Sequence, residues 1–70
     1  MRRHHVESSA VRSVGYDDER HELEIEYAEG GLYRYSLVPR RCYEELLVAP
    51  SIGAYVAEQV KPRYPATELE

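Results

Sequence analysis

The sequence predicts a small α+β domain in which a three-stranded antiparallel β-meander is followed by two short α-helices packed on one face of the sheet. Three observations predict this β-β-β-α-α order. The first half of the chain alternates apolar and polar residues with a period of two, which is typical of half-buried strands. Two adjacent glycines interrupt that alternation where a hairpin can turn. The second half places its apolar residues at helical spacing between prolines.

Length and composition limit the class of protein. The 70 residues make one domain, close to the lower limit for folding without a disulfide, a metal or a partner. A single cysteine excludes an intramolecular disulfide and is ordinary in a reducing compartment. No apolar run is long enough for a signal-peptide core or a membrane span. We therefore expect a cytoplasmic protein that does not contact a membrane.

The two ends of the chain are expected to be less ordered than its centre. Residues 1–7 are interpreted as a flexible N-terminal arm, residues 8–64 as the single domain, and residues 65–70 as a loose C-terminal tail. The arm carries two arginines and two histidines that could touch an anionic partner, although a solvated terminus is the simpler interpretation. Leu69 and Glu70 are either native or a cloning remnant.

Charge and aromatic content bear on the partner. The chain has 13 acidic and 9 basic residues, a formal charge of −4, which weighs against a general nucleic-acid binder. Most acidic residues crowd residues 17–29, whereas five of the nine basic residues lie in the third strand or beyond it: Arg34, Arg40, Arg41, Lys61 and Arg63. All seven aromatic residues are tyrosines, so the core is expected to be thin. Marginal stability or a homodimer would both fit this composition.

The first predicted strand covers residues 8–16. Val11 and Val14 are three positions apart, so strict alternation would put them on opposite faces of the sheet. A bulge near Arg12 and Ser13 would turn both valines inward. The acidic stretch at residues 17–20 then has the composition of a turn.

The second predicted strand, residues 21–27, has the clearest pattern in the chain. Apolar residues occupy one face and glutamates the other: Leu23, Ile25 and Tyr27 against Glu22, Glu24 and Glu26. This alternation predicts one buried and one solvated face, as in an antiparallel sheet covered on a single side.

The hairpin into the third strand can be given a register from pattern alone. A loop of residues 29–31 makes the apolar faces of the two strands coincide, with Gly31 supplying a positive φ. The predicted pairs are Tyr27 with Tyr33, Ile25 with Tyr35, Leu23 with Leu37, and Glu26 with Arg34 on the outer face. Tyr33 and Tyr35 could stack unpaired bases, but their position on the apolar face favours the core. An Arg34–Glu26 pair would contribute on the order of 0.2–1 kcal/mol.

Two short helices are predicted after Pro39, which suits the first turn of a helix. Residues 40–49 form the first helix, and Pro50 ends it. Ser51 is a good N-cap for the second helix, residues 52–60. The helical spacing directs these residues toward the sheet: Cys42, Tyr43, Leu46 and Leu47 from the first helix, and Ile52, Tyr55, Val56 and Val60 from the second.

With these residues in view, the chain resembles the KTSC domain, named for its occurrence at the C-terminus of some lysyl-tRNA synthetases. The resemblance covers about residues 8–64 and depends on the order and spacing of short pieces. These pieces are Ser8-Ser9, Val14-Gly15-Tyr16-Asp17, Leu23, Ile25, Tyr33-Arg34-Tyr35, Val38-Pro39, Tyr43, Leu46, Ala49, Ser51, Gly53, Tyr55, Lys61 and Tyr64. Such domains occur alone in small bacterial proteins and appended to larger ones. The resemblance implies a domain of unestablished function for which RNA binding has been suggested.

One departure from the family pattern concerns the end of the second helix. Val60 precedes Lys61 and Pro62 follows it directly. Because proline limits continuation of the helix, Pro62 constrains where Lys61 points.

The first functional hypothesis is an RNA-binding module, with tRNA or ribosome-associated RNA as the partner. Free amides at the start of the second helix favour an anion, and nearby cations could converge there. Each residue also has a structural interpretation, since Ser51 can act as a cap and Gly53 can permit close packing. The candidate nucleic-acid-binding residues are Arg40, Arg41, Ser51, Gly53, Lys61, Arg63 and Tyr64, with Tyr64 as the stacking residue.

The alternative hypothesis is a protein–protein interaction module that uses a sheet edge or the acidic face, with a homodimer as one form. Nothing in the pattern is typical of an enzyme. Cys42 has no histidine at a suggestive spacing and is interpreted as a core residue. Only His21 and Cys42 could supplement the histidines of the arm, so neither a metal nor another cofactor is expected.

Overall fold

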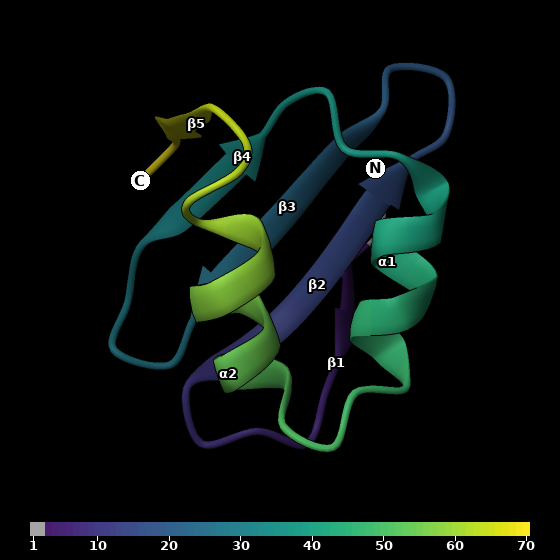
Figure 1. The fold of residues 1–70 in the computed structure, drawn as a ribbon. Coiled ribbons are helices and arrows are strands. Elements are labelled where there is room, and N and C mark those ends of the chain that lie inside the picture. The colour runs from purple at the N-terminus through teal and green to yellow at the C-terminus, as the bar shows by residue number, and fades with distance from the viewer. Residues whose placement is uncertain (1–2) are drawn as a thin grey trace.

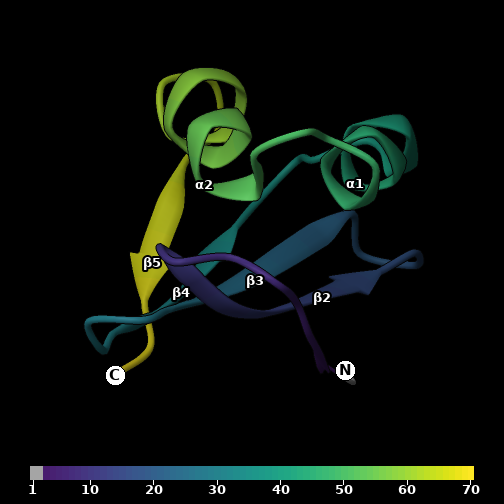
Figure 2. The same cartoon turned by 90° about the horizontal axis from the view of Figure 1, so that it is seen from below.

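The computed structural model describes residues 3–70 and has an α+β fold, with both helices on one face of an antiparallel sheet (Figures 1 and 2). The sheet contains β1 (Arg3–His5), β2 (Val11–Asp17), β3 (Glu22–Tyr27), β4 (Leu32–Tyr35) and β5 (Ala66–Glu68), in that spatial order. The helical layer contains α1 (Arg40–Leu47) and α2 (Ile52–Tyr55), which runs on as a π-helical segment, η1 (Val56–Val60). The predicted class and helix positions are confirmed, but the sheet described in residues 3–70 has five strands and not the predicted three.

The two additional strands, β1 and β5, lie in the segments expected to be a flexible arm and a loose tail. β1 pairs with β2, with Arg3 opposite Gly15, and β5 pairs with β4. The sheet contact continues past β5, where the Leu69 amide donates to the Leu32 carbonyl oxygen at 2.7 Å. All six residues of these strands are exposed. They therefore lack the apolar alternation that identifies a strand in a sequence. Met1 and Arg2 of the predicted arm lie outside the described residues.

The bulge predicted in β2 is confirmed. The pairing with β3 shifts between Val11, which lies opposite Tyr27, and Ser13, which lies opposite Glu26. The extra residue lets Val11 and Val14 both face the helices, and both are fully buried.

The predicted register of the β3–β4 hairpin is wrong by two residues. Leu23 lies opposite Tyr35 and Ile25 opposite Tyr33, so the three-residue loop is residues 28–30. A slip of two residues leaves every side chain on its predicted face. The apolar pattern fixed the faces correctly and could not separate these two registers.

Leu37 does not join the core as the predicted register required. Its backbone has a φ of 64° and its side chain is 74% exposed, whereas the next residue, Val38, is fully buried. The Val38 amide donates to the His21 carbonyl oxygen at 2.9 Å, and the Tyr16 hydroxyl donates to the Val38 carbonyl oxygen at 2.6 Å. The left-handed residue turns the chain out of the sheet, and these hydrogen bonds hold Val38 inward at the start of α1.

The core lies between the sheet and the helices. Its fully buried side chains come from both layers: Val11, Val14, Leu23, Ile25, Val38, Leu46, Val56 and Val60. Leu47, which was expected to face the sheet, is 44% exposed. Ser51 caps α2 as predicted, because its Oγ accepts a hydrogen bond from the Ala54 amide at 3.2 Å.

The outer face of the sheet is less solvated than predicted. Glu24 is only 6% exposed and lies 2.9 Å from Arg3 and 3.5 Å from Arg34. Arg34 also lies 3.6 Å from Glu22, so the predicted pairing of Arg34 with Glu26 is wrong. The shifted register of β4 explains the exchange of partners, because it places Arg34 opposite Glu24.

Candidate functional site

The four cations expected to converge at the start of α2 do not do so, because none of them lines the hollows beside Ser51. Arg40, the first residue of α1, forms ion pairs with Asp18 and Glu44. The Arg41 Nε atom lies 4.0 Å from the Glu45 carboxylate. Both arginines therefore have a carboxylate within ion-pair distance, which reduces their availability to a phosphate.

Five of the candidate residues divide between two hollows, and Ser51 lines neither of them. Arg41, Arg63 and Tyr64 line a small hollow of about 60 Å³ between α1 and the end of η1. Glu45 lines the same hollow and accepts a hydrogen bond from the Tyr55 hydroxyl at 2.9 Å. Burial raises the pKa of Tyr64 above its usual value, so this phenol is neutral near pH 7. Gly53 and Lys61 lie elsewhere, on the wall of a larger cleft.

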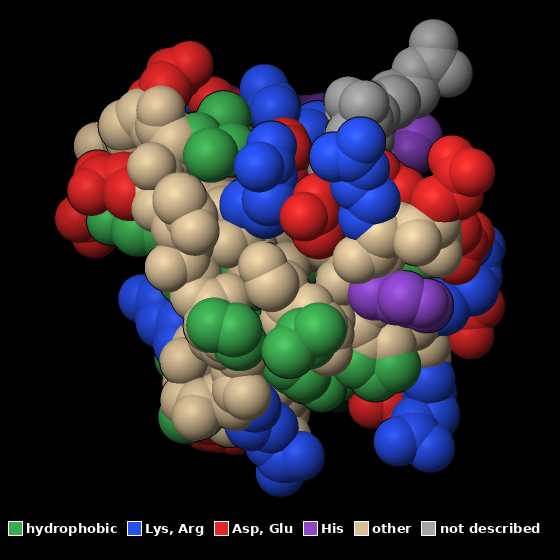
Figure 3. All heavy atoms as spheres, turned by 90° about the horizontal axis from the view of Figure 1, so that it is seen from above, with side chains coloured by type: hydrophobic (Ala, Val, Ile, Leu, Met, Phe, Trp, Pro, Cys, Tyr) green, Lys and Arg blue, Asp and Glu red, His purple; other side chains and the backbone are tan. Residues whose placement is uncertain are grey.

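Charged side chains of both signs are mixed on the face shown in Figure 3. Lys and Arg side chains there lie beside Asp and Glu side chains and form no broad basic area. The acidic face proposed for a protein partner is less negative than predicted, because its central residue, Glu24, lies between Arg3 and Arg34. The glutamates of β3 thus share the outer face of the sheet with arginines that partly neutralise them.

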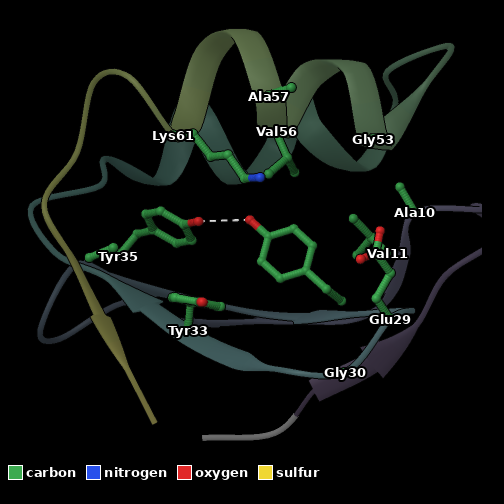
Figure 4. A pocket seen from close by; sticks show the side chains of 12 residues that line it. Ala10, Val11, Glu29, Gly30, Tyr33, Tyr35, Gly53, Val56, Ala57 and Lys61 are labelled. Carbon is green, nitrogen blue, oxygen red and sulfur yellow. Dashed lines mark hydrogen bonds between the residues drawn. The ribbon is translucent and has the colours of Figure 1, made fainter. Parts of the chain in front are cut away.

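A cleft of about 580 Å³ lies between the sheet and the helical layer (Figure 4). Tyr27, Tyr33 and Tyr35 form its sheet wall, and Gly53, Val56 and Ala57 form its helix wall. Its volume falls within the roughly 300–1,000 Å³ typical of small-molecule sites. The tyrosines point into the cleft because they share the apolar face of β3 and β4 with Ile25.

The tyrosines of the cleft are held by contacts with one another. The Tyr27 and Tyr35 hydroxyl oxygens lie 2.7 Å apart, and the Tyr27 and Tyr33 rings meet edge to face with centroids 5.6 Å apart. Tyr35 is only 3% exposed. Burial, together with the hydrogen bond to Tyr35, raises the pKa of Tyr27, so the Tyr27 hydroxyl keeps its proton at neutral pH.

Lys61 supplies a cationic group to this cleft. It directly follows η1, and its amide donates to the Val56 carbonyl oxygen at 2.9 Å. Figure 4 shows its side chain running beneath the helix toward the tyrosines, and its Nζ lies 4.9 Å from the Tyr27 ring centroid. Among residues 3–70, no carboxylate oxygen lies within 4.0 Å of this ammonium.

Gly53 brings the helix wall close to the segment before β2. A Cβ atom at this position would lie 2.9 Å from the Ala10 Cβ, closer than two such atoms normally approach. The sequence suggested that Gly53 permits close packing of the second helix against its neighbour, and the close neighbour in the structure is Ala10. Sequence reasoning missed Tyr27 and Ala57 as site residues, because no local motif links positions 30 residues apart.

Two further observations concern only the part of the chain that the structure describes. No three His, Cys, Asp or Glu side chains in residues 3–70 gather closely enough to hold a metal ion. Over the same residues, no helix has both the length and the apolar character needed to cross a membrane.

Comparison with known proteins provides a family and a close structural neighbour. The family model of the KTSC domain matches residues 7–64. An uncharacterised protein from Stutzerimonas stutzeri is 42% identical over 64 residues, covering 91% of this chain and 90% of that protein. A protein from Tsukamurella paurometabola is 41% identical over 64 residues, covering 91% and 96%. The crystal structure of a KTSC domain protein from Yersinia pestis has a TM-score of 0.95 and 32% identity, covering 99% of this chain and 97% of that chain.

Proposed function

The chain belongs to the KTSC domain family, and from that premise we propose that it is a non-catalytic binding module whose ligand occupies the cleft between the β3–β4 hairpin and α2–η1. The observation that carries this proposal is a hollow of ligand size with three tyrosines on one wall and a lysine ammonium at its edge. Apolar walls with a few polar groups are typical of binding sites. Burial raises the pKa of the Tyr27 hydroxyl, so it offers no general base at neutral pH, and the proposal includes no catalytic step.

The cleft is a better candidate than the sheet edges. The edge strands β1 and β5 have three residues each, and β1 consists of Arg3, His4 and His5. Short and charged edge strands discourage pairing with another chain. The protein–protein hypothesis based on edge pairing therefore has less support than ligand binding in the cleft.

A variant that fills the cleft tests this proposal. Ala57 is exposed and lines the cleft, so Ala57→Phe places a ring in the hollow without replacing a core residue. Ala54→Phe is the matched control, since Ala54 is exposed on the same helical layer and does not line the cleft. In an NMR screen of neutral and charged fragments against the labelled domain, we expect shifts at Tyr27 and Tyr35 for the wild type and Ala54→Phe.

We expect Ala57→Phe to weaken such binding at least tenfold. The proposal would be overturned if none of the fragments shifted the signals of the cleft residues in the wild type. Binding that is equally strong in the wild type and Ala57→Phe would also overturn it, because the ligand would then lie elsewhere.

RNA binding is the second candidate function, on a smaller surface than the sequence predicted. The observation in its favour is the shared hollow of Arg41, Arg63 and Tyr64, which places two guanidinium groups beside the Tyr64 ring. The test is an NMR titration with a short single-stranded RNA and bulk tRNA at low and moderate salt. We expect shifts at these three residues that fade with salt and disappear in Arg41→Glu combined with Arg63→Glu. Arg40→Glu is the control outside the hollow, and a silent titration at high RNA excess would exclude the hypothesis.

A further inference from the structure

We propose that the cleft binds a small monocarboxylic acid with an apolar body, with the carboxylate between the Lys61 ammonium and the Tyr27–Tyr35 hydroxyl pair. The proposal rests on the proposed function, because it names the chemical class of the ligand for the same site. It depends on three features of the cleft: an unused proton, a single cation and apolar walls.

The hydroxyl pair retains one proton that it can donate to a ligand. Tyr27 and Tyr35 together carry two O–H groups, and their mutual hydrogen bond at 2.7 Å uses only one of them. Among residues 3–70, neither hydroxyl has another hydrogen-bond acceptor. Tyr35 is 3% exposed, whereas Tyr27 is only partly buried, so a ligand oxygen in the cleft would accept the remaining proton from the Tyr27 hydroxyl.

The charge of the cleft suits a monoanion. Lys61 contributes one positive charge, and its ammonium has no carboxylate partner within 4.0 Å in residues 3–70. A phosphate dianion is usually held by several cations or by backbone amides, and a chain with a net charge of −4 would further disfavour it. A carboxylate has one negative charge and two oxygens, which match one ammonium and one hydroxyl proton.

The rest of the cleft suits an apolar group. Val11, Val56 and Ala57 line it together with the faces and edges of the tyrosine rings. The one carboxylate on the lining, Glu29, is exposed and stands in Figure 4 near Val11, away from Lys61. A ligand is therefore oriented with its acid group toward Lys61 and its apolar body toward Val11, since the reverse orientation would place two carboxylates together.

Matched ligands test this inference. In NMR titrations at pH 7, 3-phenylpropanoate is compared with 3-phenylpropanamide, which keeps the shape and lacks the charge. We expect the wild type to bind the acid at least tenfold more tightly than the amide. In Lys61→Met, which keeps an unbranched side chain over Tyr27, the two affinities should agree within a factor of two.

Arg63→Met is the control, because it removes the same charge at a position that does not line the cleft, and it should keep the tenfold preference. Equal binding of acid and amide by the wild type would overturn this inference and leave the proposed function in place. A preference for the acid that survives in Lys61→Met would also overturn it. The fragment screen with Ala57→Phe decides separately whether the cleft binds ligands at all.

Discussion

Replacing Leu46 with alanine is expected to lower the free energy of unfolding by about 2–5 kcal/mol. Leu46 is fully buried on α1 and joins this helix to the core. Alanine would leave a cavity where the leucine side chain meets the sheet. A thin two-layer core has few neighbouring side chains that could move to fill this cavity. A domain of this length has roughly 4–10 kcal/mol of total stability, so the loss would be a large part of the whole.

Leu47 provides the matched control for this prediction. It is the next residue of the same helix, and its side chain is 44% exposed. Leu47→Ala has the same change in helix propensity and should cost less than about 1 kcal/mol. Thermal unfolding followed by circular dichroism should show a melting temperature lower by roughly 4–8 °C for each kcal/mol lost. Similar melting temperatures for the two variants would show that α1 does not depend on Leu46.

Replacing Gly53 with alanine is expected to destabilise the domain by about 1–3 kcal/mol. The sign is unusual, because a glycine-to-alanine change inside a helix ordinarily gains roughly 0.5–1 kcal/mol. Here the new Cβ atom would lie 2.9 Å from the Ala10 Cβ, and neither atom is at the end of a flexible side chain. The helix or the segment before β2 must therefore move, and the movement would also disturb the cleft wall.

A double-mutant cycle isolates that contact. Ala10→Gly removes the atom that the new methyl group would meet, so the double variant should regain most of the stability lost by Gly53→Ala. Urea unfolding of the wild type, both single variants and the double variant gives the coupling free energy between positions 10 and 53. Additive losses in the double variant would mean that the cost of Gly53→Ala does not come from Ala10.

The sequence predicted those parts of the fold that depend on which face a residue occupies. Alternation placed Leu23, Ile25 and Tyr35 toward the helices, and the spacing of Val11 and Val14 required a bulge that the structure contains. The apolar pattern could not distinguish between two arrangements that bury the same residues. The hairpin register is such a case, since it was assigned by giving Leu37 a buried partner when Val38 fills that role.

The edge strands were missed for a different reason. β1 and β5 bury no side chain, so their place in the sheet depends on backbone hydrogen bonds and on one ion pair, Arg3 with Glu24. Backbone hydrogen bonds are available to any sequence that lies beside an open edge. A segment of this kind is recognised only after the rest of the sheet is known.

The candidate site could be predicted only in part. Lys61 and Gly53 were singled out as site residues for RNA, and both line the cleft, but the hydroxyl pair of Tyr27 and Tyr35 was not anticipated. The cations of α1 were expected nearby, yet Arg40 does not line the cleft and forms ion pairs with Asp18 and Glu44. The Arg40–Asp18 pair joins segments distant in sequence, which local spacing does not encode, whereas Arg40–Glu44 is a local i,i+4 pair.

The spatial order of the strands follows their order along the chain, and this has a consequence for folding. Three of the four strand pairings join consecutive segments, so the sheet from β1 to β4 can form through local hairpins, which favours fast folding. The β4–β5 pairing must close a much longer loop that includes both helices, and its entropic cost delays it. Until residues 66–68 arrive, the backbone of β4 is an open edge that another chain can pair with. A nascent or truncated chain that ends before β5 is therefore the form most prone to aggregate.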